Sequence, residues 1–142
     1  MELEELYKEI IIDHYNNPRN FGELPDSNAT AEGANPLCGD EIHIELLVKN
    51  GIVEDVKFHG AGCSISRASA SMMTETIKGK KIEDVRKISE RFKGMLFEGK
   101  EDEELGELEA FKGVRVVPIR IKCAVLSWNV LEEALKKIEK GG

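Results

Sequence analysis

The stretch from Ile42 to Phe58, IHIELLVKNGIVEDVKF, decides the fold of this 142-residue chain. Its first half alternates polar residues with apolar ones, which is typical of a strand with one buried face; the apolar residues are Ile42, Ile44, Leu46 and Val48. Asn50-Gly51 comes next, a dipeptide that favours a type I′ turn, and a second β-rich run follows from Ile52 to Phe58. The stretch therefore predicts an antiparallel hairpin.

The segments on both sides of the hairpin have helical periodicity. Apolar residues three and four positions apart predict a helix that ends near Pro18, one over 82–92, a shorter one after the acidic run 101–104, and a last one over 121–138. The small residues that follow Gly62 and precede Met72 and Met73 predict a closely packed helix that ends at Gly79. Residues 19–36 lack a sustained period, so we expect an ordered loop or a short edge strand there. The economical fold is a single α+β domain over residues 1–142, a small antiparallel sheet with helices packed on it.

The composition indicates a soluble globular protein with a strongly charged surface, since 41% of the residues are hydrophobic and 33% are charged. The net charge of -7 disfavours nonspecific binding to nucleic acid or to anionic lipid. No apolar run is long enough for a transmembrane helix, and the acidic start does not resemble a secretory signal. We therefore expect a cytoplasmic protein that has protein partners, with no nucleic acid and no membrane among them.

Three cysteines, Cys38, Cys63 and Cys123, lie far apart in the chain. Cys38 begins the sequence Cys38-Gly39-Asp40, where the glycine permits a tight turn that brings the Asp40 carboxylate near the thiolate. Cys63 opens a predicted helix, whose N-terminus favours a thiolate. Three thiolates and one carboxylate match a four-coordinate zinc site or a set of iron ligands. The alternative is three ordinary buried cysteines, because the spacing contains no C-x-x-C pair.

Four motifs occur in order along the chain: DHYNNPRN at 13–20, NPLCGD at 35–40, GAGCSIS at 60–66 and RIKCA at 120–124. Together they resemble the IscU/SufU/NifU-like family of iron-sulfur cluster assembly proteins, over nearly the whole chain. The resemblance implies a scaffold that accepts persulfide sulfur from a cysteine desulfurase and passes a transient cluster, expected to be [2Fe-2S], to acceptor proteins such as ferredoxin. It also implies that Cys38, Asp40, Cys63 and Cys123 are the ligands of zinc, iron or the cluster.

Two positions depart from the IscU pattern. Lys122 stands where IscU-type members carry a histidine before the third cysteine, and residues 116–120 replace a chaperone-recognition motif. Lys122 and the long segment 79–113 resemble the SufU branch, whose members bind zinc tightly and relay sulfur. Two alternatives therefore stay open: a zinc-dependent sulfurtransferase that holds no cluster, and an interaction module in which zinc only stabilises the fold.

The chemistry of the motifs suggests roles for individual residues. We expect Cys38 to accept sulfur first, because its glycine turn is more mobile than the helix that carries Cys63; Cys123 is the alternative acceptor. Arg120 and Lys122 flank Cys123 and could lower its pKa or pair with an anionic persulfide, although a solvated basic patch is an equal alternative. For the histidines we expect hydrogen-bonded structural roles rather than metal ligation; they are His14, His43 and His59.

Overall fold

The computed structural model describes residues 3–141 and builds an α+β fold from eight elements in that range. In chain order they are α1 (Leu3–Asn16), β1 (Ala29–Asn35), β2 (Asp40–Lys49), β3 (Ile52–Ala61), α2 (Ser64–Ile77), α3 (Ile82–Glu98), the 3₁₀ segment η1 (Glu103–Val116) and α4 (Pro118–Gly141). No helix within these residues is both long and apolar enough to cross a membrane. The predicted fold class, an antiparallel sheet with helices packed on it, is confirmed.

The sheet is antiparallel with strand order β1-β2-β3. Asn50 and Gly51 have φ angles of 54° and 75°, the left-handed values that a type I′ turn requires, so the predicted hairpin is confirmed. The alternating apolar residues of β2 point inward, and Ile42, Ile44 and Leu46 are fully buried. The end of the unpatterned segment 19–36 forms the edge strand β1, one of the two outcomes expected for it.

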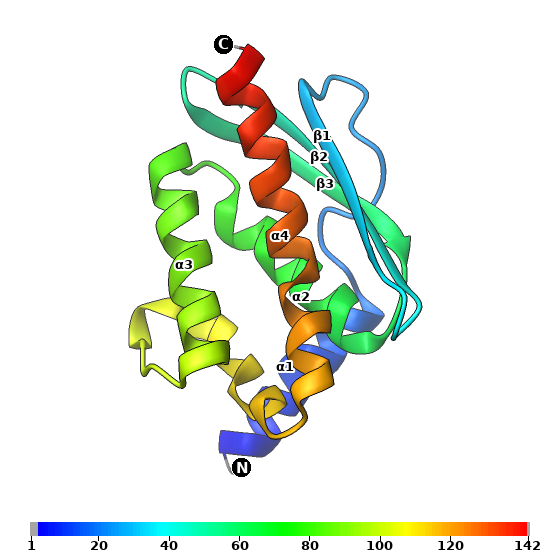
Figure 1. Cartoon of the computed structure of the whole chain (residues 1–142), viewed down its shortest axis with the longest axis vertical. Helices are drawn as coiled ribbons and strands as arrows, with labels where there is room; N and C mark the ends of the chain where they lie inside the picture. Colours follow the sequence, from blue (N-terminus) through cyan, green and yellow to red (C-terminus); the bar gives the residue numbers. More distant parts are fainter. Residues whose placement is uncertain (1–2, 142) are drawn as a thin grey trace.

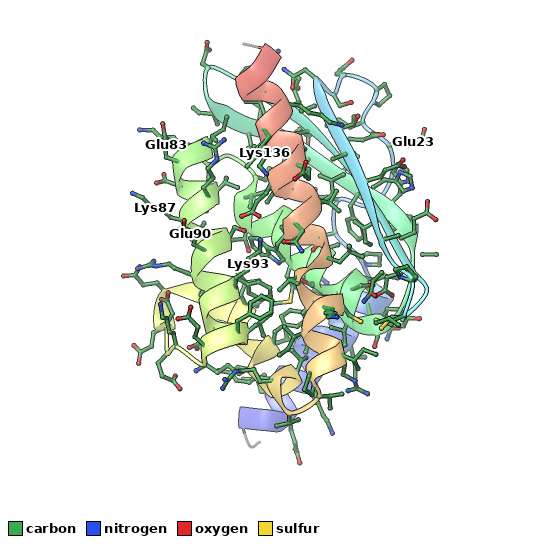
Figure 2. The ribbon with its side chains drawn as sticks, viewed as in Figure 1. Glu23, Glu83, Lys87, Glu90, Lys93 and Lys136 are labelled. Atoms are coloured by element: carbon green, nitrogen blue, oxygen red, sulfur yellow. The ribbon has the colours of Figure 1, made fainter. Side chains whose placement is uncertain are left out.

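The helices cover one face of the sheet and leave the other face without a helical layer (Figure 1). α4 packs on β1 and β2, whereas α2 packs on β3. Trp128 of α4 stacks on Phe92 of α3 with ring centroids 4.9 Å apart, and this contact joins the two helices in the core. On α3, the charged side chains of Glu83, Lys87 and Glu90 point away from the core (Figure 2), as expected for the amphipathic helix that the sequence predicts.

The segment after the acidic run differs from its predicted α-helix. It forms the 3₁₀ segment η1, which is interrupted at Gly106, where φ is 59° and ψ is -127°. A glycine adopts this conformation with little steric cost, and it breaks the i to i-4 hydrogen-bond pattern of an α-helix. The apolar residues of the segment are nevertheless buried as expected, including Leu105, Leu108 and Phe111.

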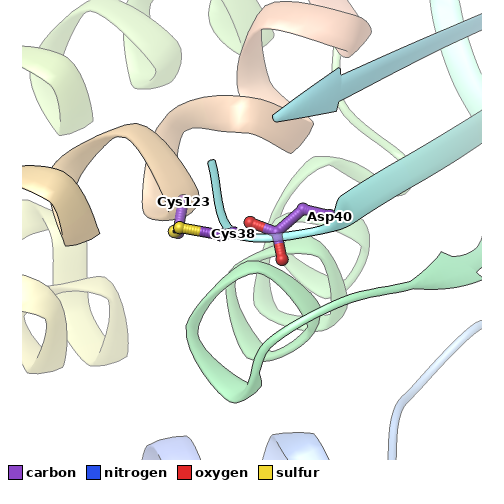
Figure 3. A group of neighbouring side chains, drawn as sticks. All are labelled: Cys38, Asp40 and Cys123. Carbon is purple, nitrogen blue, oxygen red and sulfur yellow. The ribbon is translucent and has the colours of Figure 1, made fainter. Parts of the chain in front are cut away.

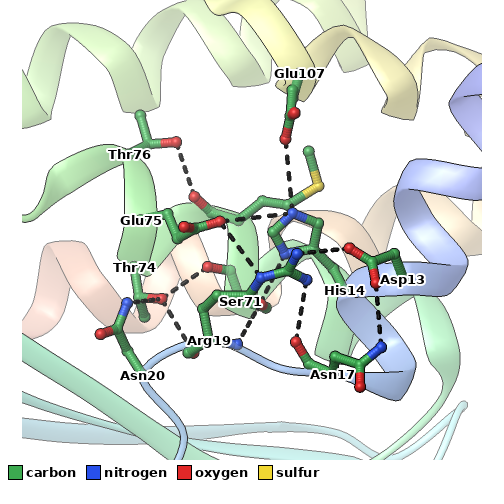
Figure 4. Close-up of polar contacts among 11 residues, drawn as sticks. Asp13, His14, Asn17, Arg19, Asn20, Ser71, Thr74, Glu75, Thr76 and Glu107 are labelled. Atoms are coloured by element: carbon green, nitrogen blue, oxygen red, sulfur yellow. Dashed lines mark hydrogen bonds and ion pairs between the residues drawn. The ribbon is translucent and has the colours of Figure 1, made fainter.

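His14, near the end of α1, connects that helix to α2 and η1. Its side chain is 3% exposed, and its Nδ1 atom lies 2.8 Å from Oγ of Ser71. Nε2 faces the carboxylates of Glu75 and Glu107 at 3.7 and 3.6 Å (Figure 4). Burial lowers the pKa of His14 from its ordinary value of 6.5, and Arg19 acts in the same direction.

The lowered pKa of His14 predicts a pH-dependent stability. Below pH 6.5 the unfolded chain binds the His14 proton more readily than the folded chain does, so we expect the free energy of unfolding to decrease as the pH falls further. Urea unfolding at several pH values between about 7.5 and about 5.5 measures this slope. The His14→Gln variant should show a smaller slope, and equal slopes in both proteins would refute the assignment.

Candidate metal centre

The connection between β1 and β2 carries the first two predicted ligands. Asn35 and Asp40 are register partners, so the four residues between them form a tight loop. Gly39 has φ of 68°, and the Cys38 amide donates a hydrogen bond to the Asn35 carbonyl at 3.1 Å. Asp40 is 2% exposed. A single turn therefore carries one thiol and one buried carboxylate side by side.

Cys63 is the N-cap residue of α2, the helix start at which the sequence placed it. Its Sγ atom accepts a hydrogen bond from the amide of Ser66 at 3.5 Å. Its own amide donates to Oδ1 of Asp40 at 2.8 Å, and its Sγ atom lies 3.8 Å from Oδ2 of the same carboxylate. The Asp40 carboxylate is thus held against Cys63 by the hydrogen bond that it accepts from the Cys63 backbone amide.

Cys123 lies near the start of α4 and is 1% exposed. Its Sγ atom is 2.9 Å from Sγ of Cys38, and both residues are free cysteines. The ligand atoms of Cys38, Asp40 and Cys123 all lie within 4.8 Å of one another (Figure 3). The structure therefore groups three of the four predicted ligands, Cys38, Asp40 and Cys123, whereas Cys63 lies outside this group with its Sγ atom 3.8 Å from the Asp40 carboxylate.

Burial is the main electrostatic influence on Cys123. It raises the pKa of the Cys123 thiol well above its ordinary value, and the neighbouring Cys38 acts in the same direction. Cys123 therefore keeps its proton at neutral pH when no cation is near. A divalent ion would reverse this preference, because it stabilises a coordinated thiolate. Three sulfur donors and one carboxylate oxygen also match the tetrahedral coordination that zinc adopts in proteins.

Arg120 and Lys122 lie in the first turns of α4 with exposed side chains. Neither forms an ion pair with a side chain in the range 5–138, the part of the chain whose side chains the structure describes. Both residues are close to Cys123 in the sequence, but their side chains face solvent whereas Cys123 is buried. Their predicted supporting role stays a prediction.

Two residues at the site were missed by sequence reasoning. Asn35 is 8% exposed, and its amide nitrogen lies 3.7 Å from Sγ of Cys123. Gly62 has no room for a side chain, since a Cβ atom there would lie 2.5 Å from Oδ1 of Asp40 and 2.8 Å from Oγ of Ser66. The signal was that each residue stands in the same motif as a predicted ligand, Asn35 three positions before Cys38 and Gly62 directly before Cys63.

Replacing Gly62 by alanine should lower metal affinity by about tenfold or more. The new methyl group would lie 2.5 Å from Oδ1 of Asp40, which is shorter than a van der Waals contact, so the carboxylate must move. Competition with a zinc chelator measures the change. Gly113→Ala is a matched control, because a Cβ atom at Gly113 would meet nothing within 4 Å, and equal affinities in the two variants would contradict the prediction.

Comparison with known proteins identifies the family of this chain. The family profile described as the NifU-like N-terminal domain matches residues 6–141. The chain belongs to this family. As a NifU-like domain it has the IscU/SufU-like fold, and the resemblance inferred from its four motifs is confirmed.

Individual relatives of this NifU-like domain are similar over nearly their full length. The zinc-dependent sulfurtransferase SufU of Bacillus subtilis is 51% identical, over 99% of this chain and 95% of the relative. The iron-sulfur cluster assembly scaffold protein IscU of Thermotoga maritima is 40% identical, over 95% of this chain and 96% of the relative. The crystal structure of a putative scaffold protein for the SUF system from Fervidobacterium islandicum superposes with a TM-score of 0.86 at 33% identity, covering 94% of this chain and 99% of that one.

Proposed function

We propose that this protein accepts sulfur from a cysteine desulfurase and serves as a scaffold for iron-sulfur cluster assembly. The observation that carries the proposal is the group formed by Cys38, Asp40 and Cys123 with Cys63 beside it, in a chain of the NifU-like family. Its relatives are named as a scaffold protein and as a sulfurtransferase. Both activities need thiolates that accept sulfur and bind a metal.

The proposed ligands are Cys38, Asp40, Cys63 and Cys123. Zinc fits this donor set, and a bound zinc ion would keep the coordinated thiols deprotonated at neutral pH. Asp40 is already oriented by the amide of Cys63 at 2.8 Å, so its carboxylate needs no rearrangement to face the site. Asn35 supplies an amide N–H towards Cys123, which would stabilise negative charge on that sulfur.

Cys38 is the proposed first acceptor of sulfur. It lies in the loop between β1 and β2 and is more exposed than Cys123. Its thiolate attacks the terminal sulfur of the persulfide on the desulfurase. A new sulfur–sulfur bond forms on Cys38, the bond within the donor persulfide breaks, and the desulfurase cysteine leaves as a thiolate. Cys123, 2.9 Å away, is the alternative acceptor or the next thiol in a relay.

The cluster itself is cargo, and we propose the [2Fe-2S] type, delivered to acceptors such as ferredoxin. Asp40 is a hard oxygen ligand and binds soft iron-sulfur units less strongly than thiolate does, which favours release over storage. The three free thiols fit a reducing compartment such as the cytoplasm.

A second candidate is a zinc-dependent sulfurtransferase that relays sulfur and holds no cluster. The observation that favours it is the 51% identity to the SufU relative, which exceeds the 40% identity to the IscU relative. Lys122 in place of the IscU histidine agrees with it. In this case Cys38 keeps its role as acceptor, and a downstream scaffold takes the sulfur.

Anaerobic reconstitution with ferrous iron, cysteine and a cysteine desulfurase tests the proposal. The scaffold role predicts sulfur-to-iron charge-transfer bands in the visible absorption spectrum, which disappear in a variant with all three cysteines replaced by serine. Persulfide on the protein without these bands would support the relay. Neither bands nor persulfide, together with unfolding on zinc chelation, would support a purely structural zinc site.

A further inference from the structure

Ser69 of α2 carries a buried hydroxyl group that the proposed function does not use. It lies six positions after Cys63, the N-cap residue of the same helix, and it is 0% exposed. A buried hydroxyl group destabilises a fold unless hydrogen bonds satisfy it, so its partners indicate what it contributes.

Two hydrogen bonds join Ser69 to α4. Its Oγ hydroxyl donates to the backbone carbonyl of Ala124 at 2.6 Å, and it accepts from Nε1 of the Trp128 indole at 3.2 Å. Ala124 and Trp128 are four positions apart, so they lie one turn apart on the same face of α4. A single side chain of α2 therefore holds both ends of one turn of α4.

This turn of α4 begins directly after Cys123. The first residues of the helix, 118–122, are exposed or half-buried, and Cys123 is the first buried residue after them. The hydrogen bond from Ser69 to Ala124 therefore lies where α4 enters the core, one residue from the thiol. Trp128, at the other end of the turn, is fixed by its stacking on Phe92.

The distance of Cys123 from the other thiols depends on how α4 packs. α4 lies across α2 (Figure 1). Cys63 is fixed at the start of α2, and Cys38 lies on a loop with its sulfur atom 2.9 Å from that of Cys123. A shift of α4 along α2 would change both separations, whereas a metal site tolerates ligand displacements of only about 0.5 Å.

We propose that Ser69 is a positioning residue that holds Cys123 at the candidate metal centre, because it fixes the first buried turn of α4 on α2. It contacts neither the thiols nor a metal in this role and acts through the backbone of Ala124. This role rests on the proposed function, since the placement of Cys123 serves sulfur transfer and metal binding only if the thiols form the site.

Alkylation of Cys123 in the metal-free protein tests this placement. In the Ser69→Ala variant the turn loses both hydrogen bonds, so α4 should open locally more often and iodoacetamide should modify Cys123 about tenfold faster than in the wild-type protein. Mass spectrometry of the modified peptide measures the rate. An unchanged rate at Cys123 would overturn the proposal.

Two control variants separate positioning from general stability. Ser127→Ala removes a buried hydroxyl group from the same helix that has no hydrogen-bond partner among the residues that the structure describes, so the alkylation rate should not change. Trp128→Phe removes one hydrogen bond and lowers stability in urea, but it keeps the bond from Ser69 to Ala124 and should keep Cys123 protected. Equal acceleration in Ser69→Ala and Trp128→Phe would make Ser69 a general core contact and refute its positioning role.

Cobalt binding distinguishes this role from the proposed function itself. Co²⁺ binds thiolates as zinc does, and its sulfur-to-cobalt charge-transfer bands report the bond. The Ser69→Ala variant should bind Co²⁺ about tenfold more weakly than the wild-type protein and Ser127→Ala do, and wild-type affinity would overturn the proposal. No charge-transfer bands in the wild-type protein would reject the metal centre of the proposed function, whereas the alkylation rates would still decide whether Ser69 holds Cys123.

Discussion

The Cys38→Ser variant is expected to lose persulfide formation on this protein by about 100-fold or more, equivalent to about 2.7 kcal/mol in activation free energy. A serine hydroxyl stays protonated at neutral pH and is a far weaker nucleophile than a thiolate. The loop that carries Cys38 is solvent-accessible, so the fold should tolerate the change. Mass spectrometry after incubation with a desulfurase and cysteine, with mapping of the modified peptide, measures the result.

Cys63→Ser is the matched control for this prediction. It removes one of the same proposed ligands and therefore weakens metal binding to a similar degree, but it leaves the proposed acceptor in place. Persulfide should still form on Cys38 in this variant, at a reduced rate. Persulfide formation at the wild-type rate in Cys38→Ser, located on Cys123, would move the acceptor role to that residue.

The Asp40→Ala variant is expected to hold a reconstituted cluster longer, by up to about tenfold in lifetime. The carboxylate is the weakest of the four proposed ligands for soft iron and adds negative charge beside three thiolates. The decay of the charge-transfer absorption in air or with a chelator measures the lifetime.

Asp40→Asn separates the charge of Asp40 from its hydrogen bond. Its amide oxygen can still accept the hydrogen bond from the Cys63 amide, whereas alanine leaves that donor unpaired, at a cost of about 1–3 kcal/mol in folding stability. If charge and ligand strength govern release, both variants should prolong the cluster. Equal or faster cluster loss in both variants would contradict the role proposed for Asp40.

The hairpin and the helices could be predicted because their signals are local. The alternation in β2 and the Asn50-Gly51 dipeptide specify two strands and their turn without reference to the rest of the chain. The interruption of η1 was missed, because Gly106 gave no pattern to distinguish a positive φ from a tolerated helical glycine.

The candidate site is harder to predict from local patterns, because its parts meet only in the folded chain. Cys38 and Cys123 are 85 positions apart and their sulfur atoms lie 2.9 Å apart, since α4 packs beside the β1–β2 loop. The spacing of the cysteines left ordinary buried residues as an alternative. The resemblance of the four motifs to a known family is what predicted that the cysteines share one site.

X-ray absorption at the zinc edge, on protein loaded with one equivalent of zinc, tests the central claim most directly. The proposed ligands predict three sulfur atoms at about 2.3 Å and one oxygen at about 2.0–2.2 Å. The Asp40→Ala variant should keep the three sulfur atoms and lose the carboxylate oxygen. Two or fewer sulfur atoms in the wild-type protein would contradict a site formed by Cys38, Cys63 and Cys123 together.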